Sequence, residues 1–345
     1  MSATLELSDD PVELTQELTA LQIGDGLPVV PATPERVARM LDALDAAPDE
    51  TIGWMPPTWG QVTARFIAIN AVLAGCAPEH MPVLVAATRA MLDPAFNLYG
   101  IQATTNPVTP LLVVHGPITR RLQMNAKAGA FGPGNYANAV LGRAIRLILT
   151  NLGGAIPGET DRATQGQAAK YTFCVAENAE DTPWRPFHAR RGLQPDDDAV
   201  TVFGIQAQHN IIDVTAANGF ELMQVLAGGM AVVATNNVTH GGEALLVISP
   251  EHARQIHESG FDPVSAGQFL YEHARIDMHR FPPRLVEHLR TRRPIWVDMA
   301  HLPIVDRHED MQILVIGGPG IQAQFLPSFG ATRAITERIV GARRS

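Results

Sequence analysis

The segment LLVVHGP, Leu111–Pro117, is a branched apolar run that ends in Gly-Pro, and ILVIGGP, Ile313–Pro319, repeats this pattern late in the chain. Runs of Val, Ile and Leu without polar alternation are typical of strands that are buried on both faces. Helical patterns lie between these runs and predict crossover connections. We therefore expect an α/β fold with mostly parallel or mixed sheets. Ligands of such sheets bind beyond the carboxyl ends of the strands, where both Gly-Pro turns fall.

Two helix starts also match each other, because Thr33 and Ser249 are each a capping residue followed by proline at the first helical position. These similarities are short, and they leave open whether the chain consists of two related halves. The acidic segment GLQPDDDAV, residues 192–200, cannot continue a core element and suggests a boundary. We expect an N-terminal α/β half, residues 1–195, with the glycine-rich loop, and a C-terminal α/β half, residues 196–345.

The composition favours a globular protein that acts on small molecules. The chain has 345 residues, 46% of them hydrophobic, and a formal net charge of −9. It has no basic cluster, which argues against nucleic acid and anionic membranes as partners. No apolar run is long enough to span a membrane, and the polar start MSATLELSDD does not resemble a signal peptide. We expect a cytoplasmic protein with a small-molecule substrate, and association into a homo-oligomer is left open.

The stretch Asn125–Gly154 joins a glycine-rich loop to a long apolar helix. Glycine adopts positive φ without strain, and the start of the helix offers free N–H groups, so loop and helix together could hold an anion, with Asn135 as the N-cap. A plain structural turn is an equally good interpretation. The substrate-binding candidates here and at the second Gly-Pro turn are Gly129, Gly132, Gly134, Asn135, Asn138, Gly318 and Gly320. Asn106 and Asn70 are further candidates, although Asn70, inside an apolar helix, fits a structural role better.

Lysine is rare in this chain. Of its 26 basic residues, only Lys127 and Lys170 are lysines. A GC-rich genome, which favours arginine codons, would explain the bias, but lysine can also lose its proton when it is buried or form a Schiff base, which arginine cannot do. We therefore take both lysines as candidate catalytic residues.

The polar segment between residues 151 and 192 is a candidate site-building loop. The candidates within it are Lys170, Tyr171, Cys174, Glu177, Asn178 and His188. In an extended segment Lys170 and Cys174 would share one face, and a nearby ammonium would lower the pKa of the thiol. A buried core cysteine is the commoner interpretation of Cys174, as it is of Cys76.

Histidine and glutamate also suggest a metal site, formed by His209, His240 and Glu243, although their spacing is not that of a zinc-binding helix. The cofactor is thus undetermined: none, or a divalent metal. The chain has no GxSxG serine motif and no GxGxxG dinucleotide motif, which weakens the serine-hydrolase and nicotinamide-dehydrogenase interpretations.

Several phrases resemble a widespread bacterial family without an established activity. They include GDGLPVVPATPERV, GIQATTNPVTPLLVVHGP, GAFGPGNYANAVLGRAIRLILTNLGG and KYTFCVAENAEDTPW. The resemblance covers most of residues 20–320 and implies an association with small thioredoxin-like proteins that carry a UGSC-type selenocysteine or cysteine motif. This chain lacks such a motif, so a redox-active thiol would come from the partner. His115 stands where the resemblance leads us to expect asparagine, and no catalytic residue is carried over.

We expect an enzyme that acts on a small polar or anionic metabolite by proton transfer, as a lyase or hydratase, or as a hydrolase. In this hypothesis the glycine loop holds the anion, Lys170 or Lys127 supplies charge or a proton, and Glu177 or His115 is the base. The alternatives are a thiol-redox component that uses Cys174 or Cys76 with a thioredoxin-like partner, a metal-dependent hydrolase, and a non-catalytic binding subunit.

Overall fold

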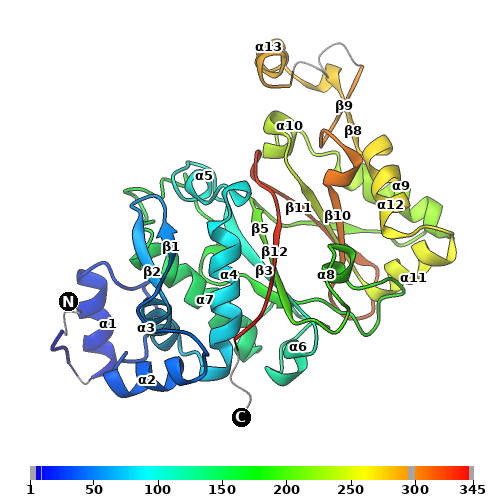
Figure 1. Ribbon diagram of the computed structural model, residues 1–345. Coiled ribbons are helices and arrows are strands. Elements are labelled where there is room, and N and C mark those ends of the chain that lie inside the picture. The colour runs from blue at the N-terminus through cyan, green and yellow to red at the C-terminus, as the bar shows by residue number, and fades with distance from the viewer. Residues whose placement is uncertain (1–4, 9, 294–299, 342–345) are drawn as a thin grey trace.

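The computed structural model describes residues 5–8, 10–293 and 300–341, and it confirms the α/β fold. Two four-stranded mixed sheets pack face to face, and helices cover the outer face of each. In Figure 1 the helices α3, α4 and α7 lie to the left of the sheets and α9, α11 and α12 to their right. The layers therefore run helix, sheet, sheet, helix.

The first sheet has the strand order β12-β5-β3-β4. Its strands are β3 (Thr109–His115), β4 (Cys174–Ala176), β5 (Ala199–Ile205) and β12 (Ile335–Arg338). Strands β3 and β4 are parallel, with Leu112 opposite Cys174, whereas β5 is antiparallel to both β3 and β12. The carboxyl ends of β3 and β4 therefore meet at one edge.

The second sheet has the strand order β10-β7-β11-β6. Its strands are β6 (His209–Ile212), β7 (Ala244–Ile248), β10 (Met311–Val315) and β11 (Gln322–Pro327). Strands β7 and β10 are parallel, with Ile248 opposite Val315, and β11 is antiparallel to β7 and β6. Each sheet thus contains one parallel pair followed by two antiparallel strands.

Successive side chains of a strand point to opposite faces of its sheet, and the hydrophobic core therefore consists of three clusters. Leu111 and Val113 of β3 face Leu245 and Val247 of β7 in the layer between the sheets. The intervening side chains of each sheet pack on its own helices. Since side chains alternate between the two faces of a strand, the apolar runs noted in the sequence are required by burial on both faces.

The helices on the first sheet are α3 (Ala64–Ala74), α4 (Met81–Leu92) and α7 (Tyr136–Asn151), with α1 (Pro11–Ala20) and α2 (Pro34–Asp42) outside them. Those on the second sheet are α9 (Gly219–Met230), α11 (Pro250–Glu258) and α12 (Pro263–His273). The shorter helices are α5 (Leu98–Gln102), α6 (Ile118–Arg121), α8 (Phe187–Arg190), α10 (Asn236–His240) and α13 (Pro283–Arg292). Two antiparallel ribbons complete the fold, β1 (Thr51–Met55) with β2 (Gly60–Thr63), and β8 (Arg275–Asp277) with β9 (His301–Pro303).

The two sheets are built by halves with the same topology. In chain order, β3, β4 and β5 correspond to β7, β10 and β11, and both sets have the same neighbours and directions. The next strand of each half then crosses to the other sheet, because β6 pairs with β11 and β12 pairs with β5. The counterpart of LLVVHGP is therefore the strand of LLVIS in β7, and ILVIGGP in β10 corresponds to β4.

The boundary expected at residue 195 does not separate the two sheets. It falls between β4 and β5, which belong to one sheet. The acidic residues beside it are bound to the first sheet and the helix after β3: Asp198 accepts a hydrogen bond from the Ile118 backbone and pairs with Arg121, and Asp197 pairs with Arg338 of β12. Here the acidic run satisfies nearby donors and cations instead of forming a linker.

The helix starts predicted at Thr33 and Ser249 are confirmed, because their side chains accept hydrogen bonds from the Arg36 and His252 backbone N–H groups.

Glycine is required where α7 crosses the segment before β4. A Cβ atom on Gly142 would lie against Thr172 and 2.5 Å from the backbone nitrogen of Phe173. Within the described part of the chain, every helix is too short or too polar to cross a bilayer.

Candidate functional site

His115 and Glu177 lie side by side at the carboxyl ends of β3 and β4. His115 is the last residue of β3, and Glu177 directly follows β4. The Nδ1 atom of His115 lies 2.7 Å from Glu177 Oε2, and its Nε2 lies 2.8 Å from Thr201 Oγ1 on β5. Both side chains are buried. The fold thus joins two residues that the sequence offered as alternative bases.

The surroundings of Glu177 favour its ionised form. The backbone N–H of Phe187 donates to both carboxylate oxygens, at 2.9 and 3.1 Å. Burial by itself raises the pKa of Glu177, but the hydrogen bond and charge of His115, together with the Phe187 N–H, hold this pKa below its usual value. The pair therefore places a charged carboxylate in the interior.

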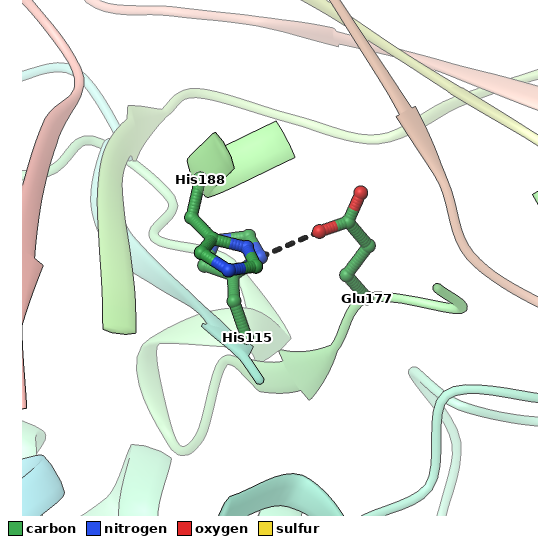
Figure 2. A group of neighbouring side chains, drawn as sticks. All are labelled: His115, Glu177 and His188. Atoms are coloured by element: carbon green, nitrogen blue, oxygen red, sulfur yellow. Dashed lines mark hydrogen bonds and ion pairs between the residues drawn. The ribbon is translucent and has the colours of Figure 1, made fainter. Parts of the chain in front are cut away.

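His188, on the short helix α8, completes the group. Figure 2 shows its imidazole over that of His115, with the Glu177 carboxylate reaching in from the side; the ring centroids are 5.2 Å apart. His188 Nε2 lies 3.2 Å from the carbonyl oxygen of Pro195, which can only accept, so Nε2 carries the proton. Its Nδ1 is buried and has no partner among the described residues. Burial, and then the neighbouring His115, lower the pKa of His188.

Beside this group lies a cavity of about 220 Å³, the strand-end cavity, whose lining includes Glu177, His188 and Lys127. Lys127 is at its exposed rim, where Nζ lies 2.9 Å from Glu180 and 3.8 Å from Asp181. The hydrogen bond to Glu180 and the charge of Asp181 raise the pKa of Lys127. Two carboxylates thus hold this ammonium in its charged form.

Lys170 lies at the other end of β4, in a short 3₁₀ turn at Ala168–Lys170. The segment before β4 is therefore not extended there, and Lys170 does not join Cys174 as expected. Its ammonium donates to both carboxylate oxygens of Asp161, at 2.7 and 2.6 Å. Burial lowers the pKa of Lys170, against the opposing effect of Asp161.

A cavity of about 450 Å³, the Lys170 cavity, opens around this pair, and Arg146 of α7 forms part of its wall. The Arg146 side chain is 12% exposed, and its Nη1 lies 3.6 Å from Asp161 Oδ2. Its Nε is buried without a partner, and no described residue forms a hydrogen bond with the guanidinium. A nearby carboxylate, Asp25, is taken by Arg143 at 2.7 and 2.9 Å. Arg146 therefore has donors to spare.

The glycine loop and the second Gly-Pro turn line the same cavity. Residues 128–132 and 317–320 enclose a cavity of about 540 Å³, the glycine cavity, at the carboxyl ends of β7 and β10. Gly129, Gly132, Gly318 and Gly320 line it, and the Gly317 N–H donates to the Ala126 carbonyl at 2.8 Å. Gly134 and the start of α7 lie outside this lining, so the helix N-terminus does not face the turn.

Two asparagines hold the glycine loop in place. Asn135 precedes α7, but its side chain does not cap the helix; its amide donates to the carbonyls of Gly129 and Gly132. Asn138 accepts from the backbone N–H of Asn125 and donates to the carbonyls of Asn125 and Ala130. Both predicted ligand-binding amides are thus engaged in loop structure.

Asn70 and Asn106 are also engaged locally. Asn70 accepts from the Asn151 amide at 2.6 Å and donates to the Phe66 carbonyl, as a structural asparagine would. Asn106 accepts from the Val108 backbone N–H at 3.0 Å.

The cysteines pack as core residues. Cys174 is 5% exposed and points into the helix-covered face of the first sheet. Cys76 Sγ lies 3.4 Å from the Val140 carbonyl. Burial raises the pKa of both thiols. The thiolate required of a nucleophile is therefore disfavoured.

The metal ligands expected from the sequence do not come together. His209 is exposed on β6, His240 ends α10, and the Glu243 carboxylate accepts from the Ala334 N–H at 2.7 Å. Within residues 5–8, 10–293 and 300–341, the one group that could hold an ion is His115, Glu177 and His188, each with a ligand atom within 4.8 Å of the others. Sequence spacing failed here because strand pairing, and not local sequence, brings such residues together.

The sequence patterns did not identify Arg146 and Asp161 as candidate site residues. Asp161 has no local signal, since it lies in an irregular loop. Arg146 did have one: it is an arginine within the apolar helix GRAIRLILT, where a charge needs a partner.

The Lys170 cavity and the histidine group thus lie at opposite ends of β4, and the glycine cavity lies at the second sheet. A scan against protein-family models finds no match to this chain, and a search of curated proteins finds none either.

Proposed function

We propose that this protein is an enzyme that binds a small metabolite bearing a carboxylate or phosphate in the Lys170 cavity and moves protons to or from it. The observation that carries the proposal is the Arg146 guanidinium, which is largely buried, lines a cavity and has no hydrogen-bonded partner among the described residues. Buried arginine donors are normally satisfied, and a carboxylate or phosphate that accepts two parallel hydrogen bonds satisfies them best.

The charges in the cavity also favour an anion. Arg146 and Lys170 provide two positive charges, and Asp161, which touches both, provides one negative charge. Asp25 and Arg143 cancel each other. One positive charge therefore remains for a ligand, and a volume of about 450 Å³ suits a small molecule.

Lys170 is the proton-transferring group in this proposal. Its pKa is lowered by burial, which brings an ammonium closer to the range where it donates and recovers a proton readily. Asp161 keeps the ammonium oriented by accepting at both oxygens. A lyase or hydratase reaction uses such a group to protonate or deprotonate a carbon or a leaving oxygen, and a hydrolase reaction is the second possibility.

The test begins with binding. We would follow thermal unfolding of the whole protein with phosphate, sulfate and short mono- and dicarboxylates, and then follow deuterium uptake into any carboxylate that binds. A ligand at 100 times its Kd stabilises the protein by about 2.7 kcal/mol. We expect Lys170→Met to abolish deuterium uptake and Arg146→Gln to abolish the anion-dependent stabilisation.

Lys127→Met is the matched control, since it removes the only other lysine, which lies in a different cavity. It should change neither readout. Because the pKa of Lys170 is lowered, anion affinity should decline as pH rises through a value below 10.5, and Lys170→Arg, which stays charged, should lose this decline. Equal anion stabilisation in wild type and Arg146→Gln would refute the proposed site. Binding without deuterium uptake would refute the lyase or hydratase reaction and leave a hydrolase or a binding protein.

A further inference from the structure

We propose that His115, Glu177 and His188 form a binding site for a divalent transition-metal ion of the zinc type. This site is separate from the Lys170 cavity, and the proposal does not rest on the function argued above. Two imidazoles and one carboxylate converge here from three elements, the end of β3, the residue after β4, and α8. Each offers a ligand atom within 4.8 Å of the others.

The unpartnered nitrogen of His188 is the first argument. His188 is 1% exposed, yet its Nδ1 has no hydrogen-bond partner among the described residues. A buried polar atom without a partner costs free energy, and a ligand that fills this position removes the cost. A metal ion beside an ionised carboxylate does so, because Nδ1 presents a lone pair once the proton is on Nε2.

The outer nitrogens give the second argument. His188 Nε2 lies 3.2 Å from the Pro195 carbonyl, and His115 Nε2 lies 2.8 Å from the Thr201 hydroxyl, which in turn lies 2.9 Å from Thr336 Oγ1. In metal-binding histidines, the ring nitrogen that does not bind the metal commonly donates a hydrogen bond of this kind. That hydrogen bond fixes the tautomer and the orientation of the ring. Both Nδ1 atoms are then the ones available to the ion.

The ligand set and the space around it indicate the class of metal. Imidazole with carboxylate suits zinc and its neighbours, whereas calcium and magnesium prefer oxygen ligands. Bonds of about 2.1 Å at tetrahedral angles place ligand atoms about 3.4 Å apart. The ligand atoms here lie within 4.8 Å of one another, and His115 Nδ1 and Glu177 Oε2, now 2.7 Å apart, would move slightly apart to admit the ion. The ion then replaces the direct His115–Glu177 hydrogen bond.

Three protein ligands leave a coordination position open. Glu177 and His188 both line the strand-end cavity, so this cavity provides the route for entry and the place for a fourth ligand. An open position is typical of catalytic zinc sites, whereas structural sites are closed by four protein ligands.

The experiment titrates Zn²⁺ and Co²⁺ into tag-free whole protein after treatment with a chelator. We expect one ion per chain, a Co²⁺ absorption spectrum of nitrogen and oxygen coordination, and a loss of affinity of more than about 100-fold in His188→Gln. Thr201→Val, which removes only an outer contact, should weaken binding by about 10- to 100-fold. His252→Gln is the matched control, because His252 of α11 is also buried with an unpartnered Nδ1 but does not belong to a group of three potential metal ligands among the described residues.

Unchanged affinity in His188→Gln, or no binding by the wild type, would overturn the proposal. If His188→Gln does not fold, X-ray absorption of the zinc-loaded wild type still decides: two imidazoles per zinc support the site, and fewer refute it.

Discussion

The carboxyl ends of the two parallel strand pairs are equivalent in topology and opposite in chemistry. At β3 and β4, His115, Glu177 and the adjacent His188 fill the edge with buried titratable groups. At β7 and β10, Ser249 and the Gly317–Gly320 turn leave a cavity of about 540 Å³ whose lining holds no charged side chain. The same backbone arrangement therefore supports either a filled polar group or an open, nearly neutral hollow.

The two edges are also joined to each other. Asn178, the residue after Glu177, donates its backbone N–H to the Val315 carbonyl and its amide to the Gly317 carbonyl. The end of β10 therefore helps to position Glu177 and its neighbours at the end of β4. The comparison shows that topology sets where a site can form, and that side chains decide which of the two positions gains ionisable chemistry.

The largest expected loss of stability comes from removing the buried Glu177 carboxylate at the end of β4. In chelator, Glu177→Ala removes the acceptor of the His115 and Phe187 hydrogen bonds and should lower the free energy of unfolding by about 3 to 5 kcal/mol. Urea unfolding measures this loss. Glu177→Gln, which keeps the shape and one acceptor, should lose less, and a loss below about 1 kcal/mol in Glu177→Ala would mean that the pair does not stabilise the fold.

The second prediction contrasts the glycines that follow the two edges. Gly116 has φ +84°, and a Cβ atom there would collide with the Asp197 carbonyl oxygen; Gly317 has φ +110° with open space around it. Gly116→Ala should cost about 2 to 4 kcal/mol, from backbone strain plus the displaced segment. Gly317→Ala should cost only the strain, about 1 to 2 kcal/mol. Equal losses in urea unfolding would contradict the difference in packing.

The smallest effect is expected at the open edge. Ser249 caps α11 through the His252 N–H and donates to the Gly320 carbonyl at 2.6 Å. Ser249→Ala should cost about 1 kcal/mol, the typical loss when an N-cap side chain is removed. Thermal unfolding measures it, with Thr33→Ala, the cap of α2, as the matched variant. A loss as large as that of Glu177→Ala would show that the two edges do not differ as described.

Local patterns predicted much of the fold. The apolar runs at Leu111 and Ile313 form buried strands, and the Thr33 and Ser249 caps begin helices. They succeeded because burial on both faces and capping are properties of a few neighbouring residues. The same patterns misjudged Asn135, whose amide binds the loop instead of the helix, since the loop's own carbonyls compete for it.

The sequence by itself determined the α/β class, the positions of its buried strands and the rarity of lysine that marked Lys170. Only the tertiary structure decided that β6 and β12 cross between the sheets, that Lys170 meets Asp161 and Arg146, and that His115, Glu177 and His188 converge. The physical reason is the distance along the chain over which each interaction acts. Strand burial and helix capping are decided within one turn or one strand. Each of these sites instead needs a partner from another element, as His115 of β3 meets Glu177 after β4 and Arg146 of α7 meets Asp161 of a loop.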